Sequence, residues 1–403
     1  MNFFETPPCY NEADSYVYAA IKPVLRTESV NLDASLHRVL AEDITALKSI
    51  PPFSRALKDG YAVKAKNTAG ISSDNPKIFE IIDYLYAGGV SKKYVSENEC
   101  VSITTGAKIP DGADAVVEIE KTGIENGRLC IYESIGYGVN IESEGQEIKK
   151  GKILLKHGTL LNPSRIGLLA SQGISKVKVF EKPKVAIISN GEELNGIDDI
   201  LKDGQIYDIN SYTVASIIEE NGCLPLKFGI VGDNSSQIRY VIEEALKVSD
   251  FVFISGGSSK GDKDFLTEIL QKLGRIPSFK IKQSNGKSGI FVLSEGKPIL
   301  GTPGFPSSCL INAYVLLVPA LRKMTQIPCI YNMNFTAKLS ENIDVSSNVT
   351  GRFLPVKIEG DRAFPLASDN KGLVNIAKAD GYVILDDETA TIEEGAAVYV
   401  NLF

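Results

Sequence analysis

Between residues 183 and 328, short apolar runs alternate with segments of helical periodicity. Four runs, at 185–188, 227–231, 251–254 and 290–293, are typical of buried strands. Apolar residues recur at helical spacing in 210–221, 237–248, 265–273 and 307–325. Strands and helices that alternate in this way predict a doubly wound α/β domain.

The chain on either side of this region has other patterns. Short β-like runs separated by turn residues fall at 61–63, 78–82, 100–103, 115–119 and 129–132 and predict a compact β-rich domain. Segments 11–44 and 163–173 have helical spacing, with a β-like run returning between 145 and 161. Short strands at 335–339, 353–358, 382–385 and 397–402 predict a small β-barrel.

A chain of 403 residues exceeds one ordinary domain, so we expect a multidomain α/β plus β protein. A domain inserted between two halves of another explains the β-like return after residue 145. The predicted division is a discontinuous N-terminal linking domain of helical and extended segments (1–50 and 142–178), an inserted β-rich domain (51–141), an α/β domain (179–328) and a C-terminal β-barrel (329–403).

Composition narrows the function classes. A hydrophobic share of 43% and a charged share of 23% are ordinary for a soluble globular protein, and the net charge of −7 argues against a nucleic-acid partner. The sequence contains neither a bilayer-length apolar run nor a signal peptide, so we expect a cytoplasmic protein without a membrane partner. Six scattered cysteines lack a Cys-x-x-Cys pair and are expected in the core.

The loop after the apolar run 251–254 is the first candidate site. Gly256, Gly257 and Ser258 allow a tight turn, and Asp264 precedes the next helical segment. A glycine-rich loop between a strand and a helix exposes unpaired N–H groups to an anion. A plain strand-to-helix turn with solvated charges is the alternative, but the acids and lysines within the loop favour a phosphate or metal-phosphate site.

Carboxylates follow three of the predicted parallel strands. Glu192 and Glu193 follow the run 185–188, Asp233 follows 227–231, and Asp264 lies beyond 251–254. Acids gathered at one sheet edge repel one another unless a cation such as Mg²⁺ is held there with phosphate or an oxyanion. Each of them taken singly is explained equally well as solvated loop charge. The loop 300–308, which includes Pro303 and Pro306, is a further candidate anion site.

Two positions in the β-rich region also combine turn chemistry with polar groups. Asp59 precedes Gly60 at the start of a predicted strand, and Thr105 precedes Gly106 between two others. Each position is either an ordinary turn or part of a ligand loop.

Taken in order, these loops resemble the signature of the molybdopterin molybdenumtransferase family, which includes MoeA and the E domain of gephyrin. The resemblance runs over nearly the whole chain. It is carried by Asp-Gly-Tyr-Ala-Val at Asp59, Thr-Gly-Ala at Thr105, Gly-Gln-Glu-Ile at Gly145, Asn-Gly-Glu-Glu-Leu at Asn190, Gly-Gln-Ile-Tyr-Asp-x-Asn at 204–210, the loop at 255–264, Pro-Gly-Phe-Pro at Pro303, and Gly-Arg-x-Leu at Gly351.

The resemblance implies an enzyme that hydrolyses adenylylated molybdopterin, inserts molybdate at the dithiolene and releases AMP with the assistance of Mg²⁺. It also implies a homodimer with its active cleft between the α/β domain of one subunit and the inserted domain of the other. The molybdopterin adenylyltransferase is a further possible partner. Tungstate in place of molybdate is an alternative substrate.

The resemblance assigns roles to particular residues. It implies catalytic roles for Asp59, Thr105, Glu193 and Asp264, with Glu193 and Asp264 also as metal ligands. Substrate or phosphate contacts are implied for Asp233, Gly256, Gly257, Ser258, Lys280, Lys287, Pro303, Pro306 and Arg352.

Several positions depart from the family pattern. Ala56-Leu57-Lys58 replaces Ser-Ala-Met, Glu142-Ser143-Glu144 replaces a basic segment, and Glu147 replaces Asp. Residues 284–288, Ser-Asn-Gly-Lys-Ser, replace Lys-Pro-Gly-Lys-Pro, so that Ser284 takes the place of one lysine, and Phe305 replaces Asn. Some of these changes remove a donor or a charge from an anion site, which commonly costs about 1.5–3 kcal/mol. The alternative to a working enzyme is therefore a catalytically weak paralogue that binds a pterin or nucleotide as a partner protein.

Overall fold

The computed structural model describes residues 10–125, 128–256, 265–282, 288–327, 334–344, 353–366, 373–385 and 391–403. The chain packs as two compact units. Glu42–Thr159 and Pro163–Val177 form one, and Met1–Ala41, Leu160–Asn162 and Lys178–Phe403 form the other. The α/β domain and the barrel both belong to the second unit. The division into four domains stays a prediction.

A six-stranded sheet organises the α/β domain, in the order β16-β13-β17-β20-β19-β18. Its strands are β13 (Lys184–Asn190), β16 (Leu224–Val231), β17 (Phe251–Ser255), β18 (Arg275–Lys282), β19 (Ser288–Ser294) and β20 (Lys297–Thr302). The four strands from β16 to β20 in this order run parallel, so their carboxyl ends meet at one edge.

The sheet is mixed rather than wholly parallel, because β19 runs antiparallel to both β18 and β20. Sequence patterning did not predict β18 and β20 as strands. Glu295 and Gly296 both have positive φ, 52° and 82°, as the tight turn between β19 and β20 requires. A two-residue connection of this kind joins only antiparallel strands.

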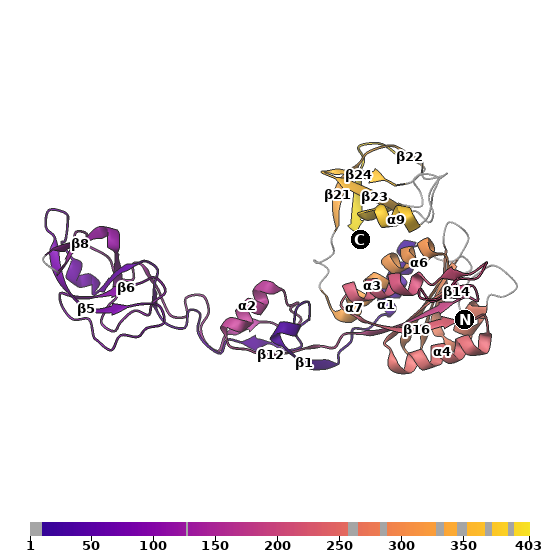
Figure 1. Ribbon diagram of the computed structural model, residues 1–403, viewed down its shortest axis with the longest axis horizontal. Coiled ribbons are helices and arrows are strands. Elements are labelled where there is room, and N and C mark those ends of the chain that lie inside the picture. Colours follow the sequence, from indigo (N-terminus) through magenta and orange to yellow (C-terminus); the bar gives the residue numbers. More distant parts are fainter. Residues whose placement is uncertain are drawn as a thin grey trace. The chain divides into compact units, whose positions relative to one another are not determined.

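Helices cover both faces of the sheet, which confirms the doubly wound arrangement (Figure 1). They are α3 (Asn210–Glu220), α4 (Ser235–Val248), α5 (Phe265–Leu273), α6 (Pro306–Asn312), a π-helical turn (Ala313–Leu317) and α7 (Val318–Thr325). Side chains of a strand alternate between the faces. Val185 and Ile187 thus pack with α3, α6 and α7, whereas Ala186 and Ile188 pack with α4 and α5.

The N-terminal segment corrects one prediction. Residues 11–44 are not largely helical: α1 (Tyr10–Ala20) is followed by β1 (Thr27–Asn31), the 3₁₀ turn η1 (Leu32–Ala34) and β2 (Ile44–Thr45). Pro23 lacks an N–H to continue a helix. Beyond it, β1 pairs with β12 (Lys176–Phe180), and Leu40 bridges to Val179. Pairing with a distant segment therefore overrides the helical spacing of this stretch.

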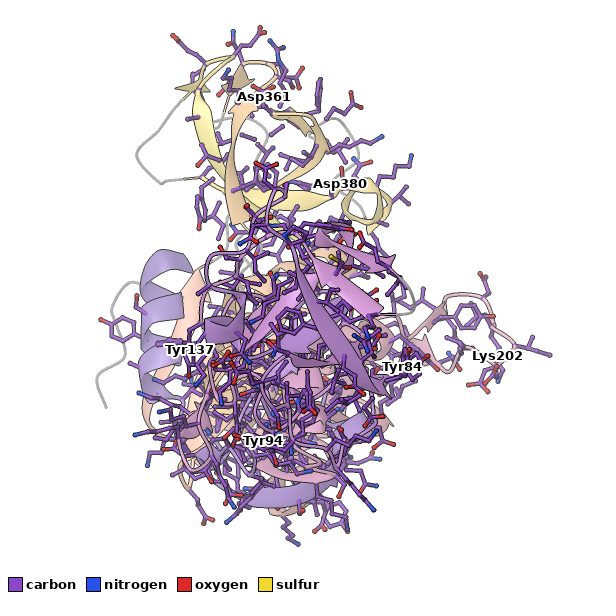
Figure 2. The ribbon with its side chains drawn as sticks, turned by 90° about the vertical axis from the view of Figure 1, so that its left-hand side faces the viewer. Tyr84, Tyr94, Tyr137, Lys202, Asp361 and Asp380 are labelled. Atoms are coloured by element: carbon purple, nitrogen blue, oxygen red, sulfur yellow. The ribbon has the colours of Figure 1, made fainter. Side chains whose placement is uncertain are left out.

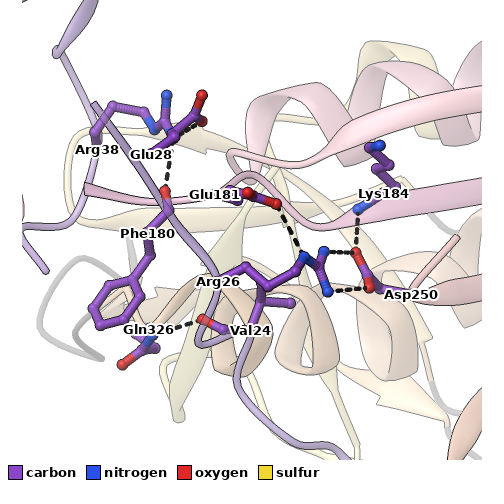
Figure 3. A network of polar contacts seen from close by, with 9 residues as sticks. All are labelled: Val24, Arg26, Glu28, Arg38, Phe180, Glu181, Lys184, Asp250 and Gln326. Atoms are coloured by element: carbon purple, nitrogen blue, oxygen red, sulfur yellow. Dashed lines mark hydrogen bonds and ion pairs between the residues drawn. The ribbon is translucent and has the colours of Figure 1, made fainter. Parts of the chain in front are cut away.

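A polar network fixes this segment to the α/β domain (Figure 3). The Arg26 guanidinium donates to both carboxylate oxygens of Asp250, at 2.9 and 2.8 Å, and to Glu181 at 2.9 Å. The backbone N–H of Lys184 also donates to Asp250, at 2.9 Å. Burial alone would raise the pKa of Asp250, but these donors outweigh it and hold the pKa below its ordinary value. The network joins the chain before β1 to the start of β13 and of β17.

The smaller unit is rich in β-structure, as predicted. Its sheet has the order β7-β4-β6-β5-β9-β8, formed by β4 (Gly60–Val63), β5 (Lys77–Leu85), β6 (Glu99–Ile103), β7 (Ala115–Glu118), β8 (Thr122–Glu125) and β9 (Arg128–Ile131). The 3₁₀ turns η2 (Ala65–Thr68) and η3 (Ile119–Lys121) flank it. Outside the sheet lie the pairs β3 (Arg55–Ala56) with β10 (Ile141–Glu142) and β2 with β11 (Ile153–Leu155), and the helix α2 (Pro163–Ser171).

A closed five-stranded barrel, β21-β24-β23-β25-β27, confirms the predicted C-terminal architecture. Its strands are β21 (Asn334–Leu339), β23 (Phe353–Glu359), β24 (Arg362–Pro365), β25 (Gly381–Ile384) and β27 (Ala397–Leu402), accompanied by β22 (Ile343–Asp344), β26 (Thr391–Ile392) and α9 (Leu373–Lys378). An aromatic cluster joins the barrel to the π-helical turn. Phe353 stacks on Tyr382 at 4.5 Å between ring centroids, and Phe403 lies 4.7 Å from Tyr314.

The cysteines within the described residues are core residues, as predicted. Cys100, Cys130, Cys223 and Cys309 are all buried and free of disulfides. Burial raises the pKa of the Cys100 and Cys309 thiols to about 12. In the part of the chain that the structure describes, none of the helices is both long enough and apolar enough to cross a membrane.

Candidate active site

Polar side chains gather where the parallel strands of the α/β sheet end. Ser189 and Asn190 end β13, Ser255 ends β17 and Thr302 ends β20, and all four are buried. The hydroxyl oxygens of Ser189 and Ser255 and the amide oxygen Oδ1 of Asn190 have no hydrogen-bond partner within the described residues. Buried polar atoms are ordinarily paired, because desolvation without a partner is costly. The unpaired atoms therefore favour a ligand site at this edge.

Sequence reasoning did not name Ser189, Asn190 or Ser255 as site residues. The signal was nevertheless in the chain, because polar residues directly follow the apolar runs 185–188 and 251–254. Serine and asparagine at a strand end are also common as turn residues, so their burial in the folded protein distinguishes them.

Gly256 brings the ends of β13 and β17 into close approach. Its φ is +98°, and a Cβ atom there would lie 2.0 Å from the carbonyl oxygen of Asn190. Its N–H donates to the carbonyl oxygen of Thr302 at 3.0 Å. Gly256 therefore contributes close packing, while its own N–H is engaged with β20 and is no unpaired donor for an anion. Gly257, Ser258 and Asp264, predicted with it, lie outside the described residues.

Asn190 draws two candidate acidic loops together. Its Nδ2 donates to the carbonyl oxygens of Val231 and Gly232 at 3.0 and 3.2 Å, and to the Asp233 carboxylate at 3.3 Å. The Glu193 carboxylate folds over Gly191, where a Cβ would lie 2.7 Å from its Oε2. Glu193 and Asp233 are both exposed. Both predicted acids therefore lie near the end of β13 and are open to solvent.

Within the described ranges, groups of three or more His, Cys, Asp or Glu that would enclose a metal ion are absent. Mg²⁺ does not require such a group, since it commonly binds one or two carboxylates and completes its shell with water and substrate phosphate. The exposed carboxylates of Glu193 and Asp233 therefore fit Mg²⁺ as oxygen donors.

The Glu193 loop is built from a short parallel pair. β14 (Leu194–Asn195) lies beside β15 (Ile206–Tyr207), and the Ile206 N–H donates to the Glu193 carbonyl at 2.9 Å. The residues between these strands project from the fold, with Lys202 in the projecting segment (Figure 2). The pairing of β14 with β15 fixes the backbone next to Glu193.

The loop between β20 and α6 contains the predicted residues Pro303 and Pro306. Pro303 is buried, and Pro306 begins α6. Phe305, at the position of a departure from the family pattern, is 53% exposed, so its ring projects into solvent rather than packing in the core. Lys280 lies on β18, with its side chain outside the described residues, as are Lys287 and Arg352.

Asp59 and Thr105 lie side by side in the smaller unit because β4 and β6 are antiparallel neighbours. The backbone N–H and the hydroxyl of Thr105 donate to Oδ1 of Asp59 at 2.6 and 2.8 Å. These bonds, the backbone bond first, lower the pKa of Asp59. A Cβ on Gly60 would lie 1.9 Å from the carbonyl oxygen of Val117, so this position requires glycine. The pair presents an exposed carboxylate of fixed orientation, with its pKa held below the ordinary value.

Glu142, which replaces a basic segment in the family pattern, pairs with Arg55. The Arg55 Nε donates to its carboxylate at 2.6 Å, across the β3–β10 pair. The charge of Glu142 is therefore neutralised locally.

Two family models match the chain. The MoeA N-terminal region, described as domains I and II, matches residues 9–173, and a probable molybdopterin-binding domain matches residues 186–323. The second match contains the strand ends that carry the unpaired atoms.

Curated relatives and a solved structure agree with these models. A molybdopterin molybdenumtransferase of Bacillus subtilis is 36% identical over 386 residues, 93% of this chain and 90% of the relative. One from Staphylococcus epidermidis is 33% identical over 398 residues, 96% and 95% of the two chains. The crystal structure of the molybdopterin biosynthesis MoeA protein from Pyrococcus horikosii has a TM-score of 0.84 at 35% identity, covering 98% of this chain and 99% of that one.

Proposed function

Because this chain belongs to the molybdopterin molybdenumtransferase family, we propose that it inserts molybdate into adenylylated molybdopterin, with release of AMP, in molybdenum cofactor biosynthesis. The observation that supports this most directly is the set of unpaired buried atoms on Ser189, Asn190 and Ser255. They lie within the part of the chain that matches a molybdopterin-binding domain.

Removal of the adenylate requires attack at phosphorus and neutralisation of the charge that develops on the phosphate oxygens. Glu193 and Asp264 would hold Mg²⁺, which supplies this neutralisation without proton transfer. In the described part of the site, Asn190 orients Asp233 by its 3.3 Å hydrogen bond. The unpaired hydroxyls of Ser189 and Ser255 are available to donate to ligand oxygen.

Asp59 would serve the same reaction as a fixed negative charge. Its two bonds from Thr105 keep it ionised and hold one of its oxygens, which leaves the other oxygen to orient water or metal-bound oxyanion. Thr105 would thus act by orienting Asp59.

We further propose that the chain works as a homodimer and receives its substrate from the molybdopterin adenylyltransferase. Light scattering at micromolar concentration checks the first point, and a monomer there would overturn it. For the second point, the rate at which adenylylated molybdopterin passes from the adenylyltransferase to this protein is measured as both are diluted. A rate that does not change on dilution would count against direct transfer.

The direct test incubates the purified protein with adenylylated molybdopterin, Mg²⁺ and either molybdate or tungstate, and measures AMP. We expect AMP release that depends on both Mg²⁺ and the oxyanion. Glu193→Gln should lower the rate at least about tenfold, since a single transition-state contact is often worth about 2–4 kcal/mol. The neighbouring Glu192→Gln is the matched control, because this side chain is also exposed and charged.

Equal rates in the two variants would remove Glu193 from the site. Absence of AMP release from the unaltered protein with either oxyanion would overturn the proposed function.

A further inference from the structure

Asn210, the first residue of α3, connects two loops of the candidate site. Its Nδ2 donates to the carbonyl oxygen of Gly304 at 2.9 Å, and its side chain is 8% exposed. Gly304 lies between Pro303 and Pro306 in the loop after β20, and it is exposed. The buried side-chain amide of Asn210 therefore anchors an exposed residue of the loop after β20.

The same loop also packs closely against the backbone at Gly256. A Cβ on Gly304 would lie 3.2 Å from the Cα of Gly256, and Gly256 itself abuts the carbonyl of Asn190. The ends of β13, β17 and β20 thus lie against one another without side chains between them. Asn210 adds a side-chain hydrogen bond to this backbone packing at Gly304.

The segment that leads into Asn210 also holds the Glu193 loop. The Ile206 N–H donates to the Glu193 carbonyl at 2.9 Å, and the Asp208 N–H donates to the Asn195 carbonyl at 2.8 Å. Asp208 is buried, and its Oδ1 accepts from the Ser211 N–H at 3.1 Å, which anchors the start of α3. Residues 206–210 therefore bind the backbone of Glu193 at one end and that of Gly304 at the other.

We propose that Asn210 is a positioning residue that sets the place of the 303–306 loop relative to Glu193, and so the affinity for the anionic part of the substrate. This proposal rests on the proposed function for its activity readout. It assigns Asn210 no contact with the reacting atoms. Because Gly304 is exposed, water replaces the lost donor in a variant, so the fold persists while the loop loses its fixed position.

The test compares Asn210→Ala with Asn221→Ala. Asn221 is at the other end of α3, is 6% exposed, and binds Ile217 and Arg322 at 2.8 and 3.0 Å, away from the 303–306 loop. We expect Asn210→Ala to raise KM for adenylylated molybdopterin about tenfold, the effect of one hydrogen bond, with kcat changed less than about threefold. Asn221→Ala should lower Tm and leave KM unchanged.

Hydrogen exchange provides a readout that does not depend on activity. The amides of Gly304, Phe305, Ser307 and Ser308 should exchange faster in Asn210→Ala than in the unaltered protein, and Asn221→Ala should not change them. Asn210→Gln retains the donor and should recover part of both effects. Unchanged exchange together with unchanged KM in Asn210→Ala would overturn the positioning role, as would a loss confined to kcat. Faster exchange in a protein that releases no AMP would retain the positioning role and reject the proposed function.

Discussion

At the scale of single residues, the ionisation of Asp59 is the most accessible test of the structure. Two bonds from Thr105 lower its pKa, and the backbone N–H contributes more than the hydroxyl. Thr105→Val removes only the hydroxyl, so the pKa of Asp59 should rise by part of the depression and stay below its ordinary value. Carboxyl NMR titration measures this change.

Asp83, which is half-buried, provides the control, because a hydroxyl, that of Ser91, and a backbone N–H, that of Tyr84, likewise lower its pKa. Its titration should be the same in Thr105→Val. A carboxylate with a depressed pKa favours the folded state above its unfolded pKa, and this contribution is lost as pH falls through the folded pKa. If the Asp59 titration does not move in the variant, the hydroxyl bond is absent in solution.

At the scale of elements, the Arg26 network predicts how strands of distant sequence are held together. Arg26→Gln should lower the free energy of unfolding by about 1–2 kcal/mol at pH 7. This value is at the lower end for charge-assisted hydrogen bonds, because solvent screens the half-exposed guanidinium of Arg26. The pKa of Asp250 is lowered in the folded state, so the variant should approach the unaltered protein as pH falls below about 4. Denaturant unfolding at several pH values measures both effects.

Arg239→Gln is the matched control. Arg239 pairs with Glu243 at 2.8 Å on the exposed surface of α4, and the pair is worth less than about 0.5 kcal/mol. Equal losses in the two arginine variants, or a loss in Arg26→Gln that is independent of pH, would show that the network does not act through the Asp250 charge.

At the scale of the whole molecule, the aromatic cluster predicts cooperation between the barrel and the α/β domain. Phe353 belongs to a barrel strand, yet it is buried in the same apolar cluster as α3, α6 and α7. Phe353→Ala should therefore cost about 3–5 kcal/mol and lower the stability of both domains together. Hydrogen exchange of β17 and β25 amides reports the two domains separately.

Tyr399→Thr serves for comparison, because Tyr399 is on the same barrel but is 55% exposed, and a change of about 0.5 kcal/mol or less is expected. Loss of protection confined to β25 in Phe353→Ala would show that the barrel unfolds independently of the sheet.

The sequence alone determined those features that depend on local periodicity. The apolar runs at 185–188 and 251–254 specify buried strands wherever they pack, and Phe265–Leu273 has the spacing of a helix in isolation. Polar residues after these runs placed the candidate site at a sheet edge, since parallel strands end on one side. Long ordered motifs also sufficed to identify the family.

Tertiary structure decided what depends on contacts between distant residues. Residues 11–44 have helical spacing, but beyond Ala20 β1 and β2 form instead, because β12 and β11 are available to pair with them. The N–H of Gly256 is engaged because β20 lies beside β17, and Asn190 faces Asp233 because β13 and β16 end together. Periodicity within a segment carries no information about which other segments will pack against it. Which residues of the site are buried, which are hydrogen-bonded and which are left unpaired is therefore decided only by the packing of distant segments.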